Sequence, residues 1–284
     1  MNVKSTRVKW LAVLVGAALA GGWVVHAAGA GQASTSKSAD VVAAKPDAPS
    51  AKPPSDPKAG NESDMPAWAL ENLPEKTIRK NADGLAVITN ASSLYVLVNK
   101  KRNLPSTYIP QDLVTPNVGF SFSGDSPKKK MRKEAAAALE KLFAGAKKAG
   151  ITLKAVSGYR SYVTQKALFD NYAKKDGIAA ANRYSAHPGQ SEHQTGLAMD
   201  VSAPSVKYQL DEKLGETKEG QWLASHAAEY GFVIRYPKGK ESITGYSYEP
   251  WHVRYVGQEA ATVIARNKLT LEQYFDALEV SANK

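Results

Sequence analysis

Two histidines and one aspartate place the strongest constraint on how this chain can fold. His193 and Asp200 lie seven residues apart in the stretch SEHQTGLAMD, and His252 follows 52 residues after Asp200. A catalytic zinc ion takes three protein ligands and keeps one position open. An isolated His-x6-Asp pair is a weak signal, so the prediction of a zinc site requires a fold that brings His252 to this stretch. Gly196 allows the backbone to turn, so that Asp200, on a following strand, faces His193.

A glutamate close to the third ligand strengthens this prediction. Glu249 precedes His252 by three residues, with Pro250 between them. Positions three apart on a regular strand face opposite sides. Because Pro250 interrupts that regularity, we expect Glu249 to reach the metal from a turn while His252 enters from a strand. A glutamate beside the metal but not bound to it suits a general base for water.

Arg160 is the candidate for binding negative charge in such a site. It follows a predicted strand, in the turn that begins the next helix. Its guanidinium group could stabilise a tetrahedral oxyanion or bind a terminal carboxylate with two hydrogen bonds. Alone, Arg160 would be an ordinary surface arginine.

The first 64 residues differ in composition from the rest of the chain. A basic start is followed by an apolar run from Trp10 to about Ala28, which is the pattern of an export signal. The run is also near the length of a membrane span. We therefore predict a signal peptide or an uncleaved N-terminal membrane anchor over residues 1–30. Residues 31–64, rich in Ala, Ser, Lys and Pro, are predicted to form a disordered linker, and residues 65–284 the folded domain.

The charge balance and the absence of cysteine limit which partners, metal ligands and covalent cross-links this chain can have. The chain has 37 basic and 27 acidic residues, and many lysines fall between Lys128 and Lys148. Outside a cell this excess favours attraction to anionic wall polymers, although a solvated helix face is the simpler interpretation. No motif for reading nucleic-acid bases is present, so no nucleic-acid partner is expected. Without cysteine, disulfides, thiolate ligands and a cysteine nucleophile are excluded.

Hydrophobic periodicity predicts an α+β domain in which a small group of strands is flanked by helices. The expected strands cover residues 94–98, 152–156, 197–201, 232–235 and 251–256. The expected helices cover residues 131–148, 162–172, 179–184, 221–230, 260–266 and 271–278.

Three motifs occur together in order and at characteristic spacing. They are SGYRSYxxQ from Ser157, SEHQTGxxxD from Ser191, and EPWH from Glu249. Over residues 94–256 the chain resembles the D-alanyl-D-alanine carboxypeptidase family of zinc peptidases, the VanY-type branch that also contains the LD-carboxypeptidases. The resemblance implies an α+β fold with a small, mainly antiparallel sheet, shared with hedgehog-like zinc domains.

The resemblance also implies roles for individual residues. One Zn²⁺ ion would be held by His193, Asp200 and His252, with Glu249 as the base and Arg160 as its catalytic partner. The residues implied to contact or enclose the C-terminal end of the peptide are Gln165, Ser191, Tyr248 and Trp251.

The expected activity is removal of C-terminal D-alanine from peptidoglycan stem peptides, outside the cytoplasm of a bacterium. The enzyme would be secreted or associated with the cell wall, or with the membrane if the N-terminal segment is uncleaved. Two alternatives stay open. An LD-carboxypeptidase would act on tetrapeptide stems, and a non-catalytic wall-binding domain would keep the fold and the metal without the activity. The intact Glu249 argues against the second, because a binding module has no use for a base at the metal.

Overall fold

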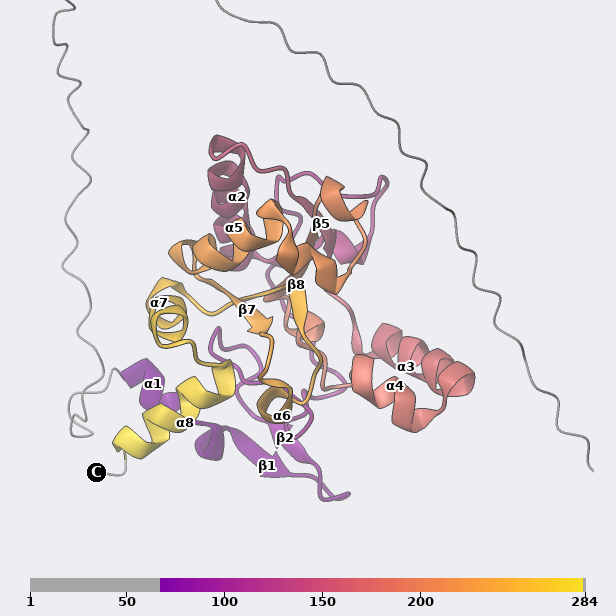
Figure 1. Ribbon diagram of the computed structural model, residues 1–284. Helices are drawn as coiled ribbons and strands as arrows, with labels where there is room; N and C mark the ends of the chain where they lie inside the picture. The colour runs from indigo at the N-terminus through magenta and orange to yellow at the C-terminus, as the bar shows by residue number, and fades with distance from the viewer. Residues whose placement is uncertain (1–66, 283–284) are drawn as a thin grey trace, which may run out of the picture. The chain divides into compact units, whose positions relative to one another are not determined.

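A four-stranded antiparallel sheet lies at the centre of the protein, whose computed structural model describes residues 67–282. The strand order is β5-β6-β8-β7. Figure 1 labels β5, β7 and β8 of this sheet. The strands are β5 (Lys154–Ser157), β6 (Ala198–Ser202), β7 (Phe232–Tyr236) and β8 (Glu249–Tyr255). Strand β6 is buried along its whole length because it lies between two neighbouring strands and is covered on both faces.

The pairing of β8 with its neighbours decides which side chains meet. Asp200 on β6 lies directly opposite His252 on β8, so the two side chains emerge side by side. On the other side of β8, Ile234 pairs with Val253 but Tyr236 pairs with Glu249. Between these two pairs β8 advances by four residues and β7 by two, so β8 bulges at this point. The expected irregularity near Pro250 is therefore present. Glu249, however, is the first residue of the strand and does not belong to a turn.

Eight α-helices and two minor sheets surround the central sheet in the described chain, together with short 3-10 turns. The helices are α1 (Ala67–Glu71), α2 (Lys133–Lys148), α3 (Tyr162–Asp176), α4 (Ile178–Tyr184), α5 (Lys218–His226), α6 (Glu241–Thr244), α7 (Gln258–Asn267) and α8 (Leu271–Ala282). The two-stranded antiparallel sheets are β1 (Ile78–Lys80) with β2 (Ala86–Ile88) and β3 (Leu113–Val114) with β4 (Met131–Arg132).

Two apolar clusters hold the helices on the central sheet. In the first, the apolar side of α2, with Leu139 and Leu142, packs with Phe232 of β7 and Leu223 of α5. In the second, Val233 packs against α7 and α8. Phe232 and Val233 are consecutive strand residues, so they point to opposite faces of the sheet. Figure 1 accordingly shows α2 and α5 close together, and α7 with α8 in a separate group.

Most predicted elements are present with shifted ends, but one prediction is wrong. The β-rich run at residues 94–98 forms no strand. Its carbonyl groups instead accept hydrogen bonds from buried arginines. Arg254 binds the carbonyls of Leu94 and Val96, and Arg102 binds that of Leu97. These guanidinium groups satisfy the backbone in place of a neighbouring strand.

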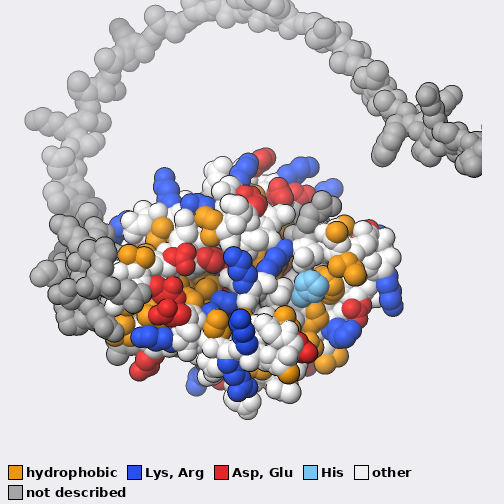
Figure 2. Space-filling view, turned by 90° about the horizontal axis from the view of Figure 1, so that it is seen from below, with side chains coloured by type: hydrophobic (Ala, Val, Ile, Leu, Met, Phe, Trp, Pro, Cys, Tyr) orange, Lys and Arg blue, Asp and Glu red, His pale blue; other side chains and the backbone are white. Residues whose placement is uncertain are grey.

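The surface shows no dominant sign of charge in the view of Figure 2, where Lys and Arg side chains appear together with Asp and Glu. The lysines of α2, at positions 133, 141, 147 and 148, are exposed, as a solvated helix face requires. Among the helices of residues 67–282, none combines the length and the hydropathy needed for a membrane span. The predicted signal or anchor and the linker lie outside the described residues.

Candidate active site

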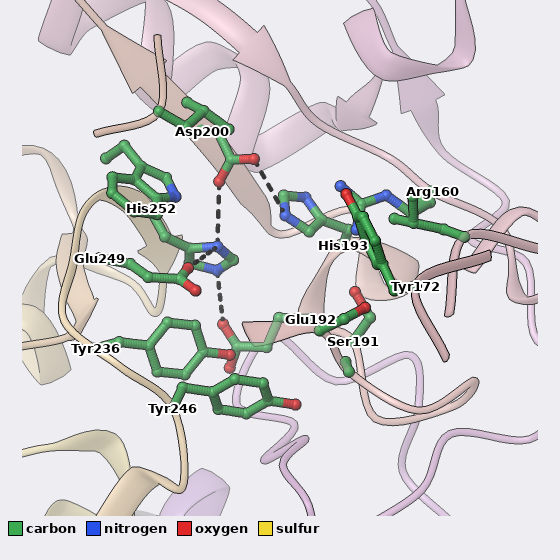
Figure 3. Close-up of a pocket in the computed structure, with 15 residues that line it drawn as sticks. Arg160, Tyr172, Ser191, Glu192, His193, Asp200, Tyr236, Tyr246, Glu249 and His252 are labelled. Carbon is green, nitrogen blue, oxygen red and sulfur yellow. Dashed lines mark hydrogen bonds and ion pairs between the residues drawn. The ribbon is translucent and has the colours of Figure 1, made fainter. Parts of the chain in front are cut away.

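The structure brings the three predicted metal ligands together. One ligand atom each from His193, Asp200 and His252 lies within 4.8 Å of the others, and all three residues are buried. The Asp200 carboxylate sits between the two imidazoles (Figure 3). Its Oδ2 lies 3.4 Å from His193 Nε2, and its Oδ1 lies 3.2 Å from His252 Nδ1.

Local folding explains how His193 and Asp200 meet. His193 belongs to a single 3-10 turn, η4 (Glu192–Thr195), and Gly196 ends that turn in the left-handed region with φ of 68°. The chain then enters β6 and presents Asp200 on the sheet. A Cβ atom at Gly196 would lie 2.9 Å from Leu113 Cδ2, so both the backbone conformation and the space require glycine.

His193 and Asp200 have the protonation states that a cation needs, whereas His252 carries a proton that a cation would displace. Burial lowers the pKa of His193 to about 3, so this imidazole is neutral. Burial disfavours the charge of Asp200, but His193 and His252 outweigh it and lower the pKa of this carboxyl. Burial likewise disfavours a charged His252, yet its contacts with Asp200 and Glu192 raise its pKa to about 9. A cation bound here would replace the proton on His252 Nδ1.

The donor set itself tests whether a metal fits. Two imidazoles and a carboxylate are the ligand types of catalytic zinc. The Asp200 Oδ1 atom is buried and accepts no hydrogen bond of good geometry from any residue in the described part of the chain. A buried carboxylate oxygen without such a partner is costly unless a cation compensates it. These observations fit a metal ion.

Glu249 stands at the edge of this cluster. Its Oε2 atom lies 3.7 Å from His252 Nδ1, and its side chain is 17% exposed. Burial raises the pKa of Glu249 to about 7, with a smaller contribution from Asp200. A carboxyl group with a pKa near neutrality can both accept and release a proton at working pH, as a general base requires.

A pocket of about 200 Å³ opens over these groups. Arg160 lines it from the turn after β5, on the far side of His193 from His252 (Figure 3). The Arg160 guanidinium donates to Gln165 Oε1 at 2.9 Å and to Ser157 Oγ at 3.4 Å. These two contacts fix its orientation and place a positive charge at one end of the pocket.

The predicted substrate residues do not all reach this pocket. Ser191 and Trp251 line it. Gln165 is 1% exposed. It accepts a hydrogen bond from Arg160 and donates one to the carbonyl of Ala186, so it orients the arginine side chain. Tyr248 lines a separate pocket with Pro250 and lies outside the first one.

The lining residues that sequence reasoning missed include one glutamate, Glu192, and three tyrosines, Tyr172, Tyr236 and Tyr246. Glu192 could have been found, because it precedes His193 in the central motif. The three tyrosines gave no such signal, since they come from three separate segments and follow no spacing relative to the ligands. The ring centroid of Tyr236 lies 5.0 Å from that of His252, which places this tyrosine beside the predicted ligands.

Comparison with known proteins places this geometry in a family. The family model described as VanY, D-alanyl-D-alanine carboxypeptidase, matches residues 128–258. A Bacillus subtilis (strain 168) relative named "Putative carboxypeptidase YodJ" is 53% identical over 200 residues, which cover 70% of this chain and 73% of the relative. The chain belongs to the VanY D-alanyl-D-alanine carboxypeptidase family.

Solved structures agree with that assignment. The LdcB LD-carboxypeptidase superposes with a TM-score of 0.68 at 54% identity, covering 70% of this chain and 92% of that chain. A VanY D,D-pentapeptidase mutant from the VanB-type resistance cassette, in complex with Zn(II), gives a TM-score of 0.53 at 32% identity. That match covers 65% of this chain and 99% of the other. The predicted α+β fold and the predicted class, a metallo-carboxypeptidase, are confirmed.

Proposed function

We propose that this chain is a zinc carboxypeptidase that removes the C-terminal D-alanine from peptidoglycan stem peptides, outside the bacterial cytoplasm. The observation that carries the proposal is the buried cluster of His193, Asp200 and His252 with Glu249 at its edge. The names of the VanY and LdcB relatives, which describe carboxypeptidases, support the reaction class and the substrate class.

The proposed cofactor is one Zn²⁺ ion, held by His193 Nε2, the Asp200 carboxylate and His252 Nδ1. When bound, zinc supplies a Lewis acid that activates water and polarises the scissile carbonyl. The chain's own residues do the remaining work. Glu249, whose Oε2 atom lies 3.7 Å from His252 Nδ1, takes a proton from the attacking water and delivers it to the departing amine.

Arg160 supplies the positive charge at the other end of the pocket. Its guanidinium has donors for the developing oxyanion or for the terminal carboxylate, and Gln165 and Ser157 hold it in orientation. Ser191 and Trp251, which line the pocket, are proposed to contact the peptide. Gln165 acts through Arg160, and Tyr248 is not assigned a substrate contact because it lies outside this pocket.

LD-carboxypeptidase activity is the second candidate, because identity to the LdcB enzyme, at 54%, exceeds that to VanY, at 32%. The two activities differ in the bond cut. A DD-enzyme cleaves D-Ala-D-Ala in a pentapeptide, and an LD-enzyme releases D-Ala from a tetrapeptide.

Mass spectrometry of defined pentapeptide and tetrapeptide stems after incubation with the zinc-loaded protein separates the two candidates. Conversion of pentapeptide alone supports the DD-activity, and conversion of tetrapeptide alone supports the LD-activity. The matched control is the same protein with zinc removed by a chelator. A protein that binds cell wall but releases no D-alanine from either peptide would contradict the enzymatic proposal and identify a binding domain.

The proposal includes export. Residues 1–30 act as a signal peptide or membrane anchor and residues 31–64 as a tether, as their composition predicts. Determining the N-terminal residue of the mature protein distinguishes cleavage from anchoring. Recovery of the protein only from the cytoplasm would contradict export.

A further inference from the structure

Glu192 lies directly behind the ligand His252 and takes part in no step described so far. Its side chain is completely buried. Figure 3 shows it on the opposite side of the His252 ring from Asp200. Its Oε2 atom lies 3.4 Å from His252 Nε2. The two nitrogens of His252 therefore face two different carboxylates.

A neutral imidazole carries one proton. If a cation takes the place of a proton between His252 Nδ1 and Asp200 Oδ1, which lie 3.2 Å apart, the remaining imidazole proton is on Nε2. Glu192 Oε2 is the acceptor that faces that nitrogen. The Gly158 carbonyl does the same for His193, because it lies 2.8 Å from Nδ1 and can only accept. Both imidazoles are thus oriented from outside the ligand cluster.

The other oxygen of Glu192 anchors it to two buried arginines. Oε1 accepts from Arg235 Nε at 2.7 Å and from Arg254 Nη1 at 2.8 Å. A carboxylate that only neutralised these guanidinium groups would use both oxygens, in the bidentate geometry that such pairs prefer. Here both arginines bind the same oxygen, and the second oxygen is left for His252. The geometry is therefore that of a support for the ligand.

Arg235 connects Glu192 to Glu272 on the C-terminal helix, α8. Its Nη1 and Nη2 atoms donate to the two carboxylate oxygens of Glu272 at 2.8 and 2.6 Å. Glu272 lies in the first turn of α8, which follows the matched family segment at residues 128–258. Two arginines and two glutamates, all buried, form a charge-balanced set. Loss of either carboxylate leaves a buried positive charge without full compensation.

We propose that Glu192 is a positioning residue for the ligand His252, and that the Arg235–Glu272 pair on α8 holds Glu192 in place. The metal site then extends, through one connected set of contacts, to a helix that contributes no ligand. This inference rests on the proposed function, since it concerns the same metal site.

The test is the zinc affinity of the full chain, measured by competition with a chromogenic zinc chelator, which needs no peptide substrate. Glu192→Gln should weaken zinc binding about 10- to 100-fold, as loss of an outer-shell partner does elsewhere. Glu272→Gln should weaken it by a smaller factor. Glu279→Gln is the matched control on the same helix: Glu279 is half-buried and accepts a hydrogen bond from the backbone N–H of Glu75, so this variant should bind zinc as the unsubstituted protein does.

The double variant separates positioning from a general loss of stability. If both glutamates act through Arg235, Glu192→Gln with Glu272→Gln should lose no more affinity than Glu192→Gln alone, because the effects are not additive along one connection. Full additivity would overturn the connection to α8. Unchanged zinc affinity in a folded Glu192→Gln protein would overturn the positioning role. If that variant does not fold, Glu272→Gln compared with Glu279→Gln decides the question.

The two proposals fail in different ways. If the unsubstituted protein binds no zinc, the proposed function fails. If it binds zinc and Glu192→Gln binds equally well, only the present inference fails.

Discussion

Replacement of Glu249 by glutamine removes the proposed base while keeping nearly the same shape. Glu249 is not one of the three clustered ligands, and its Oε2 atom lies 3.7 Å from His252 Nδ1. Burial disfavours its charge and raises its pKa to about 7. A neutral amide at this position is therefore not expected to destabilise the folded protein.

Glu249→Gln is instead expected to lower the rate of the reaction. General acid–base catalysis contributes about 100- to 10,000-fold. The loss of kcat/KM in Glu249→Gln should therefore correspond to about 3 to 5 kcal/mol of transition-state stabilisation. Zinc affinity should stay within a few-fold of the unsubstituted protein, because the three ligand atoms are unchanged.

Two measurements on the same preparation test this reasoning. D-alanine release from the preferred stem peptide gives kcat/KM, and chelator competition gives zinc affinity. Asp200→Asn serves as the contrast, since removal of a ligand should lose zinc and activity together. A zinc-loaded Glu249→Gln protein with normal turnover would refute the assignment of the base. A variant that loses zinc as Asp200→Asn does would show that Glu249 is a ligand.

Four further predictions follow from single features. Arg160→Met should lower kcat/KM about 100-fold or more at unchanged zinc affinity, as removal of an oxyanion donor does, measured by the same two assays. Gly196→Ala should destabilise the protein by about 1–3 kcal/mol in thermal unfolding, because φ is 68° and the added Cβ has no space. Burial opposes the charge of Glu272, but Arg235 outweighs it and lowers its pKa, so the ionised carboxylate stabilises the folded state above pH 4.5. The stability difference between Glu272→Gln and the unsubstituted, metal-free protein should therefore shrink as the pH falls below 4.5 through the lowered pKa. If the exposed lysines of α2 contact wall polyanions, binding to purified cell walls should weaken as salt is raised, and salt-independent binding would contradict that contact.

The approach of His193 to Asp200 was predictable because its signal is local. Gly196 marks the turn between His193 and Asp200, and its φ of 68° shows why the turn needs glycine. The strands of the central sheet and the longer helices were predictable for the same reason, since hydrophobic periodicity reflects which face each element buries. Pro250 correctly indicated an irregular strand, although the sequence did not reveal that Glu249 itself belongs to β8.

The failures have a common physical cause, which is contact between distant segments. Residues 94–98 have strand-forming side chains, but their carbonyls bind arginines from residues far along the chain, such as Arg254. Gln165, which the family resemblance implies as a substrate contact, turns inwards to Arg160 and the Ala186 carbonyl. Neither set of contacts can be predicted from local hydrophobic periodicity or residue spacing.

Arg254 connects the failed strand prediction to the metal site. One guanidinium nitrogen binds Glu192 behind His252, and another binds the carbonyls of Leu94 and Val96. A fully buried arginine is costly unless all its donors have partners. The irregular path of residues 94–98 supplies the carbonyls that a regular strand would have used in its own ladder. The same buried arginine therefore contacts both the irregular segment 94–98 and Glu192, the residue proposed to position His252.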